Sequence, residues 1–522
     1  MLGVVLRLAM FLANRSLWLD EALLALNVLD RDLGGLLEPL AFNQGAPLGF
    51  LALQELVVAG FGASEYAFRV VPLVAGIAAL PLFAVAARRS LSAVGATTAV
   101  CLLAIAEGAI YYSAENKQYS TDLLAALALL LAAQPLARGV LRTRTAIALV
   151  VVAVLAVVLS HAAILVAPAL ALAALAIRGR SQLSPRALHV LVAGSWIVLA
   201  GISGLLARSQ LANLRTSLFE AAARPPDAGA PVELAATPIV DAVLGLKRFA
   251  EAQASLLGLP TDGGIDAIAA VVFAALVVLG AGVLLRRKPE TGLLLVAPVL
   301  ATLAVIAVEQ YPLLQRTTLF LLPFTLLLAC AGLEEIARVV GGARGAAAAT
   351  VAALFLFVPA AKGAFEDLVR PRHFQELRPA LARIREDWQP GDALYVHYAA
   401  QYAFAFYSQC DCVDLSDPRG EGPLWPAIPV ADPSTDQFSP ALRSAPPTLH
   451  IGANPGNSLE GYIRDIERLR GRDRVWFVFT HASTPAEARI EYEQLPAYLD
   501  EIGTRKASFE KNGARVYLYD LS

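Results

Sequence analysis

Apolar residues of this chain gather in long runs that short polar segments separate. A membrane-spanning helix needs about 20 predominantly apolar residues, and many of the runs reach or approach that length. They cover residues 66–87, 91–112, 119–137, 145–177, 187–207, 265–285, 290–309, 317–333 and 346–361. Because runs of this length recur through the first two thirds of the chain, the pattern predicts a polytopic α-helical membrane protein.

Basic clusters between these runs set the expected orientation. The positive-inside rule places all of them in the cytoplasm. The clusters are Arg88 with Arg89, Arg138 to Arg144, Arg178 to Arg186, Arg286 to Lys288, and Arg338 with Arg344. All these clusters lie on the same side of the membrane only if the run 145–177 is two short helices broken near Ser160 and His161. With Met1–Ala13 as a short first helix, we predict about eleven transmembrane helices.

Two other apolar segments do not fit as spans. Pro47–Phe61 contains Gln54 and Glu55, and counting it as a span would invert every later loop. Leu17–Leu29 combines leucines and alanines at helical spacing with acidic residues. Amphipathic segments of this kind lie at the membrane interface. We therefore predict two juxtamembrane helices in a long first outer loop, residues 14–65.

The last part of the chain has a different pattern, which predicts a soluble α/β domain over 362–522. Strand-like segments rich in β-branched and aromatic residues alternate there with helical ones. We expect helices at 373–387, 458–470 and 485–502, and strands at 393–397, 448–451, 475–479, 507–510 and 514–519. A turn signal, Lys511-Asn512-Gly513, joins the last two strands as a hairpin. The membrane domain then covers 1–361, with a second large outer loop at 208–264, and parity places the α/β domain outside the cytoplasm.

Composition and charge exclude other classes. Hydrophobic residues make up 57% of the chain and charged residues only 16%, whereas a soluble domain is about a quarter charged. A formal net charge of −2 lacks the basic excess of a nucleic-acid-binding protein. Cys101 and Cys330 lie inside apolar runs, where they are expected to pack. Cys410 and Cys412 are so close in sequence that a bond between them would need strain.

Acids, bases and aromatic residues collect at the predicted outer ends of the spans. They are Asp20, Glu21, Arg69, Glu115, Lys117, Tyr119, His161, Tyr311, Gln315 and Arg316. Each has an ordinary structural explanation, since acids at a helix start complement its dipole and arginines anchor in lipid headgroups. Ionisable groups at membrane level are nevertheless costly and mark functional sites. A carboxylate that takes a proton from a hydroxyl, beside cations that hold a phosphate, suits transfer from a lipid phosphate.

Five segments, in matching order over residues 1–361, resemble motifs of membrane glycosyltransferases of the GT-C superfamily. They are Trp18-Leu19-Asp20-Glu21 (W-x-D-E), Ala46-Pro47-Leu48 (H-P-P-L without its histidine and first proline), Phe61 to Arg69 (fG-x-s-E-x-x-x-R), Tyr112 to Tyr119 (ysqEaRxY with lysine for arginine) and Tyr311 to Pro323 (yP…R…Lfl.P). The chain resembles most the family-39-like and RgtA/B/C/D-like transferases, relatives of protein O-mannosyltransferases and aminoarabinose transferases.

This resemblance implies an inverting transfer of a sugar from a polyprenyl-phosphate donor to a hydroxyl of a lipid, glycan or protein outside the membrane. Asp20 would be the general base or would orient it, with Glu21 supporting it or helping to bind a metal. The donor phosphate would be held by Arg69, Lys117 and Arg316, and the donor or substrate site lined by Glu115, Tyr119, His161 and Gln315. Some members of the superfamily use a divalent cation, so Mg or Mn on Asp20 and Glu21 stays open.

Two other functions stay open at this stage. A transporter or flippase of a lipid-linked sugar shares the cavity and the cations, but predicts charges near mid-membrane and broken helices in both halves. A scaffold or receptor would bind glycans with its outer domain, whose aromatic residues either stack on sugars or form the core. These residues are Tyr395, Tyr398, Tyr402, Tyr407 and Trp425. Abundant alanine and arginine indicate a GC-rich bacterial source, and hence the bacterial cytoplasmic membrane.

Overall fold

The computed structural model describes most of the chain, and its described residues fall into two compact units. They are 1–137, 143–178, 186–207, 238–261, 267–308, 310–410, 412–417, 423–425, 448–452, 458–480 and 488–522. The first unit contains Met1–Ala13, Gly45–Leu53 and Arg69–Pro371. The second contains Asn14–Gln44, Gln54–Phe68 and Arg372–Ser522. Of the predicted outer loop 208–264, only 238–261 lies among the described residues.

Helices form where the apolar runs predict them. Up to residue 369 they are α1 (Leu2–Leu12), α2 (Leu19–Leu29), η1 (Gly35–Leu37), α3 (Leu48–Phe61), α4 (Glu65–Ser90), α5 (Ala93–Ile105), α6 (Glu107–Tyr111), η2 (Tyr112–Ala114), α7 (Tyr119–Ala137), α8 (Thr143–Leu159), α9 (Ala163–Arg178), α10 (Arg186–Leu206), α12 (Pro238–Leu257), α13 (Ala267–Arg287), α14 (Pro289–Ala307), η4 (Arg316–Leu321), α15 (Leu322–Val340) and α16 (Gly342–Val369). The long run 145–177 is broken between α8 and α9, as predicted. The two helices expected in the first outer loop are present as α2 and α3.

Several of these helices have the length and apolarity of membrane spans. Within the described residues, five are long and apolar enough to cross a membrane, or six if the bent pair α5–α6 is one span. Only 17% of the apolar window in α16 is buried, as expected of a helix whose side chains face lipid. Shorter apolar helices, α8 and α9 among them, occupy the other predicted spans. The total of eleven and the outward orientation stay predictions.

A buried arginine stabilises the bend between α5 and α6. The chain turns by 56° where α5 ends, which leaves carbonyl groups of its last turn without helical partners. Arg7 of α1, which is fully buried, donates to the carbonyl oxygens of Ala104 at 3.3 Å and Leu103 at 3.4 Å. The guanidinium thereby satisfies the freed carbonyls and holds α6 and η2 where the candidate site begins.

Glycines allow α13 and α15 to pack closely. A Cβ added at Gly280 would collide with the carbonyl oxygen of Leu328, and one at Gly332 with that of Leu276. Small residues are the usual means by which membrane helices approach each other. This contact fixes α15, and therefore the start of η4, which carries Arg316.

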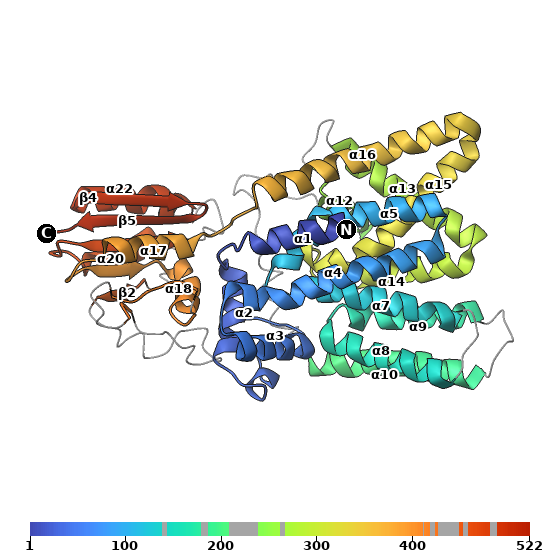
Figure 1. Ribbon diagram of the computed structural model, residues 1–522, viewed down its shortest axis with the longest axis horizontal. Coiled ribbons are helices and arrows are strands. Elements are labelled where there is room, and N and C mark those ends of the chain that lie inside the picture. Colours follow the sequence, from blue (N-terminus) through green and yellow to red (C-terminus); the bar gives the residue numbers. More distant parts are fainter. Residues whose placement is uncertain are drawn as a thin grey trace. The chain divides into compact units, whose positions relative to one another are not determined.

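After α16, which runs past the predicted boundary to Val369, the C-terminal part forms a five-stranded sheet with helices (Figure 1). Its elements are α17 (Leu377–Asp387), β1 (Ala393–Val396), η5 (Tyr398–Ala400), α18 (Gln401–Tyr407), β2 (Leu449–Ile451), α20 (Leu459–Glu467), β3 (Val475–Thr480), the π-helix η6 (Ile490–Gln494), α22 (Leu495–Ile502), β4 (Thr504–Lys511) and β5 (Ala514–Asp520). The strand order is β2-β1-β3-β5-β4, parallel from β2 to β3 and antiparallel beyond. The predicted β4–β5 hairpin turns at Asn512 and Gly513, both with positive φ.

Aromatic residues of this domain mostly form its core. The side chains of Tyr395, Phe477 and Tyr519 pack with residues of α20 and α22 on one face of the sheet, and α17 packs against β4 and β5. Of the aromatics considered as sugar-stacking residues, Tyr395, Tyr402, Tyr407 and Trp425 are buried and Tyr398 is half-buried. The core explanation therefore holds for the four buried rings.

Candidate active site

The two predicted catalytic acids lie in the first turn of α2, in the second unit. Asp20 is half-buried and Glu21 is fully buried. The helix begins at Leu19 because the backbone of Trp18 is extended. Both carboxylates therefore lie at the positive end of the helix dipole.

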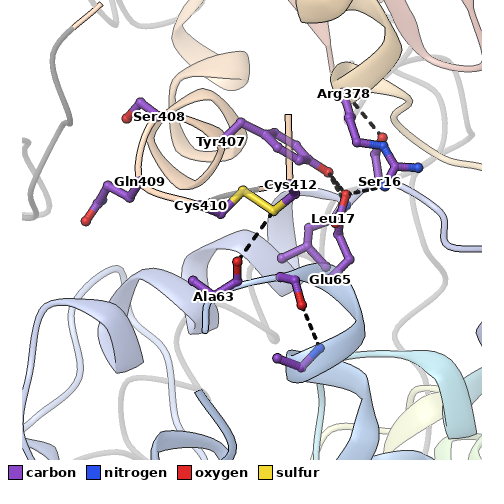
Figure 2. The surroundings of a disulfide bond; sticks show 12 residues. Ser16, Leu17, Ala63, Glu65, Arg378, Tyr407, Ser408, Gln409, Cys410 and Cys412 are labelled. Atoms are coloured by element: carbon purple, nitrogen blue, oxygen red, sulfur yellow. Dashed lines mark hydrogen bonds and ion pairs between the residues drawn. A yellow bond between two sulfur atoms is a disulfide. The ribbon is translucent and has the colours of Figure 1, made fainter. Parts of the chain in front are cut away.

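Side chains of the C-terminal domain bind the backbone just before these acids. The Leu17 N–H donates to the Tyr407 hydroxyl at 2.9 Å, and the Leu19 N–H donates to Gln375 Oε1 at 2.9 Å. Figure 2 shows Tyr407 of α18 pointing at Leu17. Burial, and next the Glu65 carboxylate, raise the pKa of the Tyr407 phenol well above its ordinary value. The phenol therefore stays protonated and donates to Glu65 Oε1 at 3.1 Å.

A disulfide that the sequence spacing did not favour follows α18. Cys410 and Cys412 are bonded, with their Cα atoms 5.3 Å apart. Cys412 Sγ lies 3.9 Å from the Ala63 carbonyl oxygen, just before Glu65 (Figure 2). The bond therefore closes a tight loop beside the start of α4.

In the first unit, a buried cluster forms where the chain passes from η2 to α7. Glu115, Lys117 and Tyr119 are all buried there, and the Lys117 N–H donates to the Glu115 carbonyl oxygen at 2.7 Å in a tight turn. The Tyr112 ring packs edge-on against Tyr119, with centroids 5.3 Å apart. The Tyr112 phenol lies within electrostatic reach of Glu115 and Arg316. The structure thus brings Glu115, Tyr119 and Arg316 together around Tyr112, which the sequence analysis quoted in a motif without assigning it a role.

The segment before η4 supplies the other predicted residues of this unit. Gln315 Nε2 donates to Ser255 Oγ of α12 at 2.9 Å, so its side chain is directed at that helix. Tyr311 donates to the Thr317 carbonyl oxygen at 2.7 Å, which folds the segment back on itself. Arg316 is half-buried at the start of η4. Arg69 is buried in α4, one turn after the helix begins.

The break between α8 and α9 binds a further carboxylate, on α7, that the sequence did not single out. Asp122, buried in the first turn of α7, accepts hydrogen bonds from the Ser160 side chain and the Ala162 N–H. Its Oδ1 has no hydrogen-bond partner among the described residues. The half-buried His161 lies between Ser160 and Ala162. A signal existed, because Asp122 is three residues after Tyr119 and so shares its helix face.

The acids do not by themselves make a metal site. Neighbouring residues of a helix point about 100° apart, and Glu21 is fully buried. Among the described residues, no group of three or more His, Cys, Asp or Glu side chains is placed to hold a metal ion. Binding of Mg or Mn by Asp20 or Glu21 together with a donor phosphate stays a prediction.

Two solved structures share the fold of this chain almost from end to end. The crystal structure of ArnT from Cupriavidus metallidurans in the apo state is 13% identical, with a TM-score of 0.50, and the match covers 98% of this chain and 96% of that chain. The same protein bound to undecaprenyl phosphate is 12% identical, with a TM-score of 0.53, covering 99% of this chain and 97% of that chain. No family model and no curated protein matches the chain.

The likeness defines the fold class. This chain has the fold of ArnT, in agreement with the fold that the five sequence motifs implied. At these identities the comparison establishes the fold alone. The reaction that the protein catalyses depends on the residues of its own site.

Proposed function

We propose that the protein is an inverting glycosyltransferase that moves a sugar from a polyprenyl-phosphate donor to an acceptor hydroxyl at the outer face of a membrane. The observation that carries the proposal is the cluster around the buried Tyr112, whose phenol lies within electrostatic reach of both Glu115 and Arg316. Charged groups at membrane level are costly and by default mark a functional site. ArnT, which shares the fold, has been crystallised with undecaprenyl phosphate.

Cations of the first unit bind the donor phosphate in this proposal. Arg69, Lys117 and Arg316 each donate charge-assisted hydrogen bonds, which are stronger than neutral ones. Their positive charge also stabilises the phosphate as the bond to the sugar breaks, which lowers the transition-state energy. Arg69 and Lys117 are nearly fully buried, so water screens their charge little.

Asp20 acts as the general base. The acceptor hydroxyl oxygen forms a bond to the anomeric carbon while the bond from that carbon to the phosphate oxygen breaks. The hydroxyl proton passes to the Asp20 carboxylate, and the electron pair leaves with polyprenyl phosphate. Attack from the face opposite the leaving group inverts the anomeric configuration. The buried Glu21 supports Asp20 on the next residue of the helix.

The remaining residues shape the donor site. Glu115 and Tyr119 lie beside Tyr112, and in this proposal they contact the sugar or its phosphate. Gln315 orients the segment that carries Arg316 through its bond to Ser255. His161 acts from the α8–α9 break, where the two residues that flank it, Ser160 and Ala162, bind Asp122.

Location and acceptor complete the proposal. The positive-inside rule orients the eleven predicted spans with the C-terminal domain outside the bacterial cytoplasmic membrane. A lipid, glycan or protein acceptor of the cell envelope would lie on that side of the membrane. The acceptor and the sugar themselves are to be identified by assay.

A flippase for a lipid-linked sugar is the second candidate. The helix breaks at Ala106 and at Ser160 supply one feature that transporters use. The paired acids of α2, however, have no role in moving a lipid across the membrane. Transferase activity therefore accounts for more of the observed residues.

The test is transfer by the purified protein from a panel of radiolabelled polyprenyl-phosphate sugars. Wild type and Asp20→Asn are compared, each with and without a chelator. We expect wild type alone to release polyprenyl phosphate, and Asp20→Asn to bind donor without turnover. Equal turnover in Asp20→Asn would remove the base assignment. Donor binding without any release, together with lipid flipping in liposomes, would favour the flippase.

A further inference from the structure

The helix that carries Asp20 has no cap of its own. Its N-cap residue is Trp18, whose side chain makes no capping hydrogen bond, and α2 is only 11 residues long. A helix this short is marginal in isolation, and the N–H groups of its first turn need partners from elsewhere.

Gln375 supplies one such partner, and it and its two neighbours in the chain bind the segment that leads into α2. Gln375 Oε1 accepts from the Leu19 N–H at 2.9 Å, and Gln375 is only 3% exposed. Glu376 accepts from both the N–H and the hydroxyl of Ser16, each at 3.2 Å. Phe374 packs on the Trp18 ring, with centroids 5.8 Å apart. The start of α2 is therefore held both by hydrogen bonds and by an aromatic contact.

The sheet holds these residues in turn. The Glu376 N–H donates to the Asn512 carbonyl oxygen at 3.1 Å, at the tip of the β4–β5 hairpin. A Cβ at Gly513 would collide with the Phe374 carbonyl oxygen, so this close approach needs glycine there. The β4–β5 hairpin therefore fixes the segment that binds the first turn of α2.

We infer that Gln375 is a positioning residue, which fixes the first turn of α2 and thereby sets the direction of the Asp20 carboxylate. The inference rests on the proposed role of Asp20. Gln375 itself touches no reacting group, and its effect passes through the Leu19 backbone. A misplacement of the base by about 1 Å can lower a rate by about 100-fold.

The test compares Gln375→Met, which keeps the volume and loses the acceptor, with Gln375→Glu, which keeps an acceptor oxygen. Gln389→Ala, an exposed glutamine of the same domain, is the control. We expect Gln375→Met to lower kcat by about 10- to 100-fold with donor affinity unchanged, and to speed amide hydrogen exchange in the peptide 16–22. We expect Gln375→Glu to keep that amide protection and to recover kcat relative to Gln375→Met.

Two results would overturn the inference. One is a wild-type kcat in Gln375→Met, and the other is a lowered kcat without faster exchange at 16–22. If Gln375→Met does not fold, Tyr407→Phe removes the acceptor of the Leu17 N–H while the ring stays in place, and the same two readouts apply. Failure of the proposed function is separate, because wild type would then release no polyprenyl phosphate and the exchange data alone would decide whether Gln375 holds α2.

Discussion

Arg378 Nη1 lies 2.9 Å from Glu65 Oε1, and only 2% of the Glu65 side chain is exposed. The first residue of α4 is thereby paired with the second residue of α17. Arg378 also donates to the Asn14 carbonyl oxygen at 2.7 Å. One guanidinium thus joins both ends of the first predicted outer loop to the C-terminal domain, which explains why most of that loop belongs to the second unit.

Removing this guanidinium should destabilise the second unit strongly. In Arg378→Met the Glu65 carboxylate stays buried without its cation, a change that typically costs about 3–5 kcal/mol. We expect a clear fall in the thermal midpoint of the detergent-solubilised protein. Arg383→Met is the control, because its pairs with Glu386 and Asp387 are exposed and should contribute less than about 1 kcal/mol. Equal midpoints for the two variants would contradict the prediction.

The close approach of α13 and α15 predicts a contrast between two glycines of one helix. Gly280→Ala places a methyl against the Leu328 carbonyl, whereas nothing lies near a Cβ at Gly282. Overpacking of this kind costs about 1–3 kcal/mol, while alanine at an open helical position is neutral or stabilising. Thermal unfolding in detergent should show a lower midpoint for Gly280→Ala only. A similar loss in Gly282→Ala would contradict the packing explanation, because that Cβ meets no neighbouring atom.

Donor binding should depend on the cations of the first unit. Arg316→Ala and Lys117→Ala each remove charge-assisted hydrogen bonds worth about 1.5–3 kcal/mol, which corresponds to about 10- to 100-fold in donor Kd. Titration with a fluorescent polyprenyl phosphate measures this directly. Arg344→Ala, at an exposed position in α16, should bind as wild type does. Unchanged affinity in both test variants would make Arg316 and Lys117 structural residues.

The C-terminal domain should lose stability in acid. Burial lowers the pKa of His397 from 6.5 to about 3, although Glu491 Oε1 lies 3.4 Å from its Nδ1. Between these values the unfolded chain binds a proton that the folded domain does not, so stability falls as the pH drops from about 6.5 towards 3 and is constant above. Calorimetry from pH 4 to 8 should show this slope in wild type. His397→Gln should flatten it, and a parallel slope in both proteins would exclude His397 as its source.

The outward orientation is open to chemical labelling. A cysteine at the half-buried Ile164, with Cys101 and Cys330 replaced by serine, should react with an impermeant maleimide added outside intact cells. The reason is that α9 begins at Ala163, directly after the predicted outer break. Labelling only after the cytoplasmic side is opened would reverse the assignment of this turn and of every outer loop.

The sequence alone determined most elements, because their signals are local. Apolar periodicity located the helices, including the break at Ser160 and His161, which positive-inside parity required. The turn at Asn512 and Gly513 was readable because few other residues adopt positive φ. The sequence also predicted that Glu115, Lys117 and Tyr119 lie close together in space, because they are near neighbours along the chain.

Only the tertiary structure decided the long-range partners. Gln375 and Leu19 are 356 residues apart, and nothing in either neighbourhood indicates that one caps the helix of the other. Nothing in the sequence around Asp122 indicates that its carboxylate accepts hydrogen bonds from Ser160 and Ala162 at the α8–α9 break. The Cys410–Cys412 bond likewise depends on the backbone path after α18, not on spacing. Local patterns determine what a segment becomes, whereas which segments meet depends on how the whole chain packs.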